Sequence, residues 1–128
     1  MQAERDAPPS DGAATSVIYK IVPAALWREA RSSGVFCGAP VDVADGFIHF
    51  SSAAQVEETA RRHFARQDGL LLVAVDAARL GPALKWERSR GGDLFPHFYG
   101  HLPLDAVLRE QFLPLGSDGH HDFAGLLA

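Results

Sequence analysis

The segment Asp45-Gly46-Phe47-Ile48-His49-Phe50-Ser51-Ser52 carries most of the structural information in this chain of 128 residues. Its short apolar run predicts a strand over residues 46–50. Because side chains alternate along a strand, Phe47, His49 and Ser51 share one face, opposite Ile48 and Phe50. The first face changes from apolar to polar along the strand, as the floor of a cleft does where it opens to water. We therefore expect His49 and Ser51 to line a small-ligand site. The alternative for His49 is a half-buried histidine hydrogen-bonded to a neighbour.

The serines that follow favour a helix start rather than a nucleophile. Ser52 and Gln55 have the spacing of a capping box, and apolar residues recur at helical intervals up to Phe64. The segment Asp68-Gly69 is the expected end of this helix. Ser51 and Ser52 lack the flanking glycines of a nucleophile elbow, so capping explains them better than serine-hydrolase chemistry.

The flanking sequence predicts an α+β fold with two early helices. A β-rich run over 17–22 precedes Pro23, which suits the first position of a helix that ends before Gly34. The continuous apolar run 70–75 is typical of a central strand buried on both faces. Further strands are expected over 84–87, 95–99 and 106–115. We expect a mixed, mostly antiparallel sheet of about five to six strands.

Length and composition indicate a single domain in a reducing compartment. Residues 1–15 predict a disordered N-terminal tail, 16–115 a single α+β domain, and 116–128 a flexible C-terminal tail. The net charge of −4 argues against a nucleic-acid surface. One cysteine allows no intrachain disulfide, and no apolar run reaches membrane-spanning length, so we expect a cytoplasmic protein without a membrane partner. The oligomeric state stays open.

A second group of polar residues follows the third predicted strand. Glu87 alternates with Trp86, and His97 shares a face with Tyr99 if the segment is extended. The alternatives are a solvated strand face for Glu87 and a packed polar residue for His97. No HExxH or paired-cysteine motif is present, so we expect no metal site.

Several of these segments together resemble the bacterial family called domain of unknown function 952. The resemblance runs from about Val17 to Leu115 and rests on the segments IYKI, ALWREA, DGFIHFS, LLLVAVD, LKWE, GGDLFPHFYG and LPLDAV. The fold of that uncharacterised family is thought to be similar to the ADP-ribosyltransferase superfamily, which cleaves the nicotinamide–ribose bond of NAD. The resemblance therefore implies an ADP-ribosyltransferase-like fold and NAD as the ligand to consider.

The resemblance also implies roles for particular residues. His49 and Ser51 match the His-x-Ser segment that RNA 2′-phosphotransferases carry on the second strand. Glu87 is the best match for the glutamate that stabilises a ribose oxocarbenium ion in some branches. Many relatives read IYHI where this chain has IYKI, so Lys20 replaces a histidine. A lysine donates hydrogen bonds only, and suits a phosphate or carboxylate.

Three hypotheses follow from the sequence. The first is a transferase-like or glycohydrolase-like enzyme acting on NAD or another nucleotide. In it Glu87 and His49 are catalytic, while Lys20, His49, Ser51, His97 and Tyr99 bind the ligand. The second is a non-catalytic module that binds a small anion in the same cleft. The third is a homo-oligomeric interaction domain that pairs through an exposed strand edge.

Overall fold

The computed structural model describes residues 17–127, so the tail expected over residues 1–15 lies outside the described part. Within it, the helices are α2 (Ala24–Ser33), α3 (Pro40–Asp45) and α4 (Val56–His63). The strands are β1 (Val17–Pro23), β2 (Val35–Phe36), β3 (Ile48–His49), β4 (Leu70–Asp76), β5 (Leu84–Arg88), β6 (Leu94–Phe98), β7 (Leu102–Pro103) and β8 (Val107–Leu113). Short 3-10 segments span Ala77–Ala83, Arg90–Gly92 and Leu104–Ala106.

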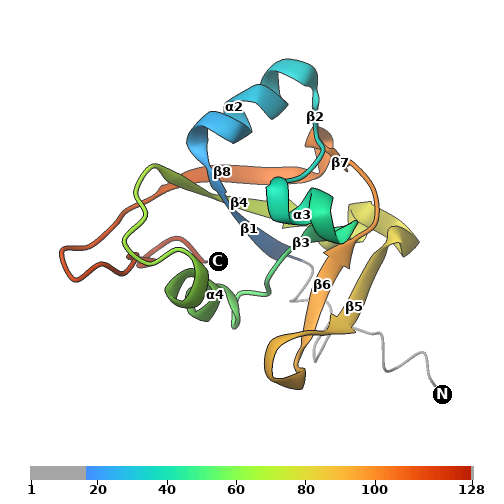
Figure 1. Ribbon diagram of the computed structural model, residues 1–128. Coiled ribbons are helices and arrows are strands. Elements are labelled where there is room, and N and C mark those ends of the chain that lie inside the picture. The colour runs from blue at the N-terminus through green and yellow to red at the C-terminus, as the bar shows by residue number, and fades with distance from the viewer. Residues whose placement is uncertain (1–16, 128) are drawn as a thin grey trace.

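The strands form three small sheets, and every pairing between them is antiparallel. The first sheet has the order β1-β4-β8, the second pairs β2 with β7, and the third has the order β3-β6-β5. The α+β class and the antiparallel character expected from the sequence are confirmed. The strands, however, are divided among three sheets rather than joined in one. Figure 1 shows the β5–β6 hairpin extending away from the sheet that contains β1 and β4.

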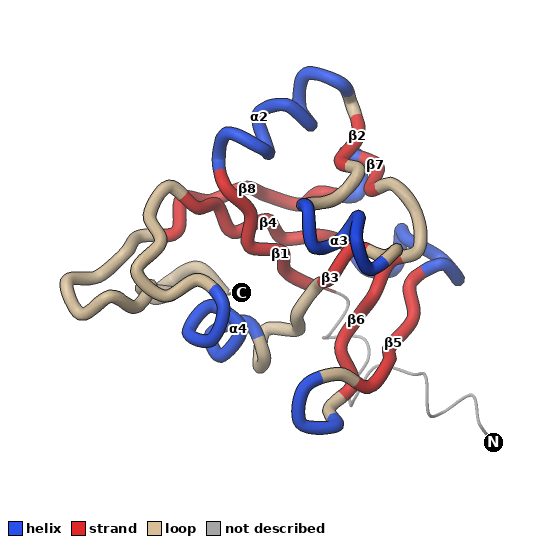
Figure 2. The backbone as a smooth tube through the Cα atoms, viewed as in Figure 1, coloured by secondary structure: helices blue, strands red, loops and turns tan. Residues whose placement is uncertain are grey.

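Residues 45–52 join two of these sheets. Ile48 and His49 pair with Phe98 and His97 of β6. Two residues later the backbone of Ser51 exchanges both hydrogen bonds with Tyr19 of β1, at 2.8 and 2.9 Å. Figure 2 shows the chain after β3 running past β1 towards α4. The polar side chains of β1, β3 and β6 are therefore gathered at this junction.

The first sheet is covered on both faces. Trp27 of α2 belongs to the core on one face, whereas Val56 and Ala60 of α4 belong to the core on the other. Figure 1 accordingly shows α2 and α4 on opposite sides of β1 and β4. In β4, Leu72, Val73, Ala74 and Val75 are all buried, which confirms the two-sided burial predicted from their continuous apolar run.

The helix predicted after Ser52 is shorter in the structure. A turn follows Ser52, and α4 covers only Val56–His63. Of the predicted capping box, the glutamine half is present, because the Ser52 amide donates to Gln55 Oε1 at 3.0 Å. The helix ends before Asp68-Gly69 because the chain turns towards the C-terminal segment. The amide of Arg66, at a φ of +66°, donates to the Gly119 carbonyl at 2.8 Å.

The C-terminal segment over residues 116–127, where the sequence predicts a flexible tail, contacts the domain in the structure. Leu115 and His121 form an isolated antiparallel bridge, and the His121 ring contacts the Gln67 carbonyl at 2.7 Å. Phe123 is 6% exposed and packs into the core beside α4. The sequence pattern missed this because the segment contributes one buried anchor rather than a periodic stripe.

Replacing Phe123 by alanine tests whether this segment stabilises the domain. We expect Phe123→Ala to lower the free energy of unfolding by about 3 kcal/mol, because a buried aromatic ring is lost from a packed core. Phe112, which is 57% exposed on β8, is the matched control, and Phe112→Ala should cost less than about 1 kcal/mol. Urea unfolding of both variants makes the comparison. Equal effects would contradict the packing of the C-terminal segment.

Candidate functional site

A buried carboxylate, Asp42 of α3, lies at the centre of the polar junction. It is 2% exposed. Its Oδ1 accepts from Lys20 Nζ at 3.0 Å and from the amide of His49 at 3.1 Å, and lies 2.6 Å from His49 Nδ1. Its Oδ2 accepts from the Ala39 amide at 2.7 Å and lies 3.0 Å from Lys20 Nζ. Asp42 thereby ties β1, the start of α3 and β3 together.

The local sequence explains why α3 delivers a carboxylate here. Pro40 occupies the first helical position, and Gly46 ends the helix in the left-handed conformation at φ +89°. Asp42 is the third helical residue, from which a carboxylate can reach back to the amide that precedes the helix. Gly38 makes room for it, since a Cβ at Gly38 would lie 2.9 Å from the Asp42 Cβ, and its φ of +117° also favours glycine.

The opposite charges of Asp42 and Lys20 compensate each other in the protein interior. Burial alone would raise the pKa of Asp42, but the hydrogen bond from His49, the Lys20 charge and the Ala39 amide lower it to about 2. Burial lowers the pKa of Lys20, and the Asp42 carboxylate opposes that shift. The Lys20 side chain is 7% exposed, so its ammonium is committed to an internal partner.

His49 is held between two carboxylates. Its Nδ1 faces Asp42, and its Nε2 lies 3.0 Å from Oδ2 of Asp45, one turn along α3. Both contacts can be hydrogen bonds at the same time only when each ring nitrogen carries a hydrogen. The side chain of His49 is 31% exposed and that of Asp45 is 48% exposed, so a ligand can displace Asp45 from Nε2.

His97 has a different environment on the neighbouring strand. Its Nδ1 lies 2.8 Å from Glu87 Oε1, and the same oxygen accepts from the Tyr99 hydroxyl at 2.8 Å. Burial lowers the pKa of His97 below 6.5, and the hydrogen bond to Glu87 opposes that shift. His97 is therefore neutral at neutral pH, with Nδ1–H donating to Glu87. No other described residue hydrogen-bonds to its Nε2, which keeps its lone pair.

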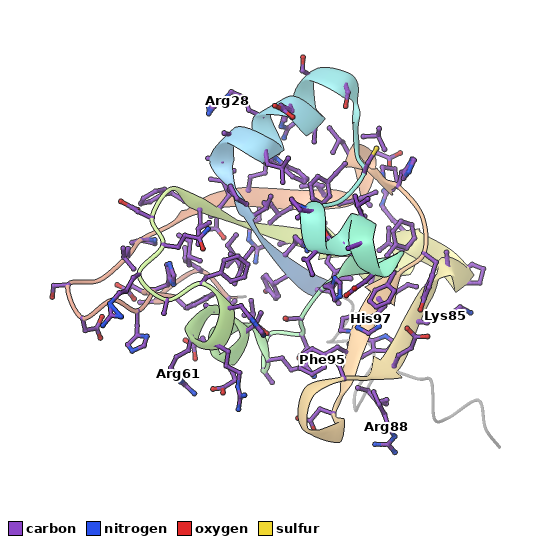
Figure 3. All side chains as sticks on the ribbon, in the orientation of Figure 1. Arg28, Arg61, Lys85, Arg88, Phe95 and His97 are labelled. Atoms are coloured by element: carbon purple, nitrogen blue, oxygen red, sulfur yellow. The ribbon has the colours of Figure 1, made fainter. Side chains whose placement is uncertain are left out.

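The two imidazoles lie side by side because their strands pair in register. His49 is directly opposite His97, which is opposite Lys85 on β5. The centroids of the two histidine rings are 5.5 Å apart, and the Phe47 ring stacks on His97 at 4.2 Å. Figure 3 shows His97 and Phe95 on β6, with Lys85 on the adjacent strand.

The histidine pair borders a cavity of about 520 Å³, which is within the range of small-molecule sites. The cavity lies among β1, α3, α4 and β6. Its aromatic wall consists of Tyr19, Phe50, Phe64 and Phe95, and its polar lining consists of Lys20, Asp45, His49, Ser51, Thr59, His63, Ser89 and His97.

Four of the residues singled out from the sequence line this cavity: Lys20, His49, Ser51 and His97. Ser51 is 4% exposed, and its hydroxyl is 2.9 Å from that of Thr59. Glu87 and Tyr99 are not among the lining residues. Glu87 supports the Nδ1 side of His97, and the Tyr99 ring lies 5.2 Å from Phe47. Direct ligand contacts by Glu87 and Tyr99 therefore have no support from the geometry.

Asp42 and Asp45 were not predicted as site residues from the sequence. The signals were present, because Pro40 and Gly46 frame a six-residue helix with a carboxylate at its third position. A helix this short has no apolar periodicity to reveal it. Within residues 17–127, no group of three or more side chains is arranged to hold a metal ion, and no helix is long and apolar enough to cross a membrane.

Comparison with known proteins gives the family. A model described as protein of unknown function (DUF952) matches residues 21–110. The chain belongs to the DUF952 family. The function of this family is unknown, and no curated protein matches the chain.

Solved structures of one relative have the same fold. A crystal structure of protein CC0527 from Caulobacter crescentus is 48% identical, with a TM-score of 0.82 over 84% of this chain and 95% of that chain. A double mutant of CC0527 gives 46% identity and a TM-score of 0.81 over the same shares of both chains. The solution NMR structure of CC0527 gives 48% and 0.79 over 88% of this chain and 97% of that chain. All three are structural genomics targets, and none of them supports the ADP-ribosyltransferase-like fold expected from the sequence.

Replacing Asp42 tests its central position. Asp42→Asn leaves the buried Lys20 ammonium without its counter-charge, so we expect a loss of about 3 kcal/mol in the free energy of unfolding. Asp45→Asn changes a half-exposed carboxylate and should cost less than about 0.5 kcal/mol. Adding Lys20→Met to Asp42→Asn should recover part of the loss. Equal stability of the two single variants in urea unfolding would contradict the role of Asp42.

The same carboxylate should shape the acid limb of the stability curve. Its folded-state pKa of about 2 lies below the ordinary 3.8, so its stabilisation is complete above about pH 4. As the pH falls from about 4 to 2, the protein should lose about 2 kcal/mol from this group alone. Urea unfolding at successive pH values measures this, and Asp42→Asn should remove that part of the slope. An unchanged slope in the variant would contradict the low pKa.

Proposed function

We propose that this protein is an enzyme that cleaves or transfers part of a small nucleoside-like molecule by paired acid–base catalysis. One observation supports this above all. Two adjacent histidines line one cavity: His97 has Glu87 at Nδ1 and no hydrogen-bond partner at Nε2 among residues 17–127, while His49 has a carboxylate at each ring nitrogen. Environments that separate the proton affinities of two neighbouring groups are a common way to assign a base and an acid.

In a hydrolytic reaction the two histidines have complementary tasks. His97 Nε2 takes a proton from a water molecule as the water oxygen bonds to the reacting carbon. The bond from that carbon to the leaving nitrogen breaks, and its electron pair stays on the nitrogen. His49 Nε2 supplies the proton that the leaving nitrogen takes up. One water is consumed, and the proton gained by His97 balances the one lost by His49. Acid–base assistance of this kind contributes roughly 10²- to 10⁴-fold in rate.

The carboxylates act behind the histidines in this proposal. Glu87 holds His97 in the tautomer that leaves Nε2 free, and Asp42 orients His49. This replaces the role first suggested for Glu87, in which its carboxylate would itself stabilise an oxocarbenium ion. The anion-binding module is less well supported, because the Lys20 ammonium is already paired with Asp42.

The proposal includes a relationship to the ADP-ribosyltransferase superfamily, as the sequence resemblance implies. This relationship makes NAD the first molecule to test. Nicotinamide leaves NAD as a neutral molecule and requires no proton. A nucleoside base leaves as an anion unless it is protonated. A comparison of NAD with uncharged nucleosides therefore distinguishes the contribution of the general base, His97, from that of the general acid, His49.

We expect His97→Asn to lower kcat/KM about 100-fold or more on any turned-over compound of this set, and His49→Asn to affect nucleosides more than NAD. Release of nicotinamide or of the free base, followed by liquid chromatography, is the measurement. His101 is exposed and outside the cavity lining, so His101→Asn is the matched control and should keep full activity. No release above the blank from NAD or the nucleosides, with folded wild-type protein, would refute the proposed enzyme.

A further inference from the structure

The charges around the cavity indicate which molecules it accepts. Close to the two imidazoles lie three carboxylates, those of Asp42, Asp45 and Glu87, and one ammonium, that of Lys20. Asp42 and Lys20 neutralise each other at 3.0 Å. Glu87 lies behind His97, outside the cavity lining, and the Lys85 charge acts on it. Asp45 is then the one carboxylate among the described residues that line the cavity. The half-exposed carboxylate of Asp45 therefore makes the end of the cavity that holds the histidines electronegative.

The arginines nearby along the chain do not offset the Asp45 charge at the cavity. Arg61 and Arg62 form ion pairs with Glu58 on the outer side of α4 and are more than half exposed. Arg88 donates to the Gly92 carbonyl at 2.7 Å within its own turn. Figure 3 shows the labelled Arg61 and Arg88 side chains extending outward from the protein. None of the three is among the residues that line the cavity.

The remaining wall suits a flat ring. Tyr19, Phe50, Phe64 and Phe95 are the aromatic residues, apart from the histidines, among those that line the cavity. The face of an aromatic ring attracts a cation within about 6 Å by roughly 0.5–2 kcal/mol and stacks on neutral rings. An anion gains nothing from such a face and is repelled by the Asp45 carboxylate. The aromatic residues and Asp45 thus both favour a neutral or cationic ring over an anionic one.

We infer that the cavity binds the ring of a neutral or cationic heterocyclic compound and rejects anionic rings. This inference rests on the same cavity as the proposed function and specifies the substrate class for it. A phosphate-bearing substrate would have to keep its phosphates outside the histidine end of the cavity. Asp45 is the specificity-determining residue, because its half-exposed carboxylate lies at the lining and next to His49 Nε2.

A series of three compounds with one shape and different charge tests this inference. Benzylamine is cationic at neutral pH, benzyl alcohol is neutral and benzoate is anionic. Their dissociation constants can be measured by following amide shifts of the full-length protein in NMR titrations. We expect benzylamine to bind at least tenfold more tightly than benzoate, with benzyl alcohol between them. The amides of Thr59, Phe95 and His97 should shift, because these residues line the cavity.

Two variants distinguish the effect of the Asp45 charge at the cavity from the effect of the overall charge of the protein. Asp45→Asn should reduce the preference for benzylamine over benzoate several-fold. Asp105→Asn removes the same charge from an exposed position outside the cavity lining and should leave the preference unchanged. Benzoate binding as tightly as benzylamine, equal effects of the two variants, or shifts confined to other parts of the protein would overturn the inference.

This test and the turnover test can fail independently. If the charge order holds but no compound is turned over, the cavity is a binding site for neutral or cationic rings and the catalytic proposal fails. If turnover depends on His97 but benzoate binds best, the catalytic proposal stands and the substrate class inferred from the field is wrong.

Discussion

The buried carboxylate of Asp42 is the interaction on which the candidate site depends. It accepts hydrogen bonds from Lys20 on β1 and from the amides of Ala39 and His49, and it contacts the ring of His49. A buried carboxylate is stable only when such partners surround it, because removal from water costs several kcal/mol. The partners come from segments that are separate in sequence. The carboxylate therefore fixes the position of α3 against β1 and β3 and, with it, the orientation of His49.

A second carboxylate, Glu87, gives the neighbouring His97 a hydrogen-bonding environment different from that of His49. His97 is more deeply buried than His49 and is neutral at neutral pH, with one nitrogen bound to Glu87. His49 lies between Asp42 and Asp45 and is partly open to solvent. The two rings are only 5.5 Å apart, so the difference arises from their immediate partners rather than from their place in the fold. Polar groups of this kind interact more strongly in a partly dry cavity than in water.

Much of this arrangement could be predicted from the sequence where a local pattern determines the structure. Alternation along one strand placed His49 and Ser51 on a common face, and both residues line the cavity. The apolar run of β4 indicated burial on both faces. Alternation also placed Trp86 and Glu87 on opposite faces of their strand, and Trp86 is the buried one, at 5% exposed. Periodicity could not show that Asp42 pairs with Lys20, because the two residues are 22 positions apart and α3 is too short for a pattern. Nor could it show that Glu87 lies behind His97, since that depends on the register of β5 against β6.

The proposal depends most on a neutral His97 ring that keeps a lone pair at Nε2 next to His49. Long-range proton–nitrogen NMR of the histidine rings in the uniformly labelled protein at pH 7 tests it most directly. We expect the His97 ring to be neutral, with hydrogen on Nδ1 and none on Nε2, and we expect Glu87→Gln to alter its signals while His49 keeps its hydrogen on Nδ1. A doubly protonated His97 at pH 7, or a neutral His97 with its hydrogen on Nε2, would contradict it.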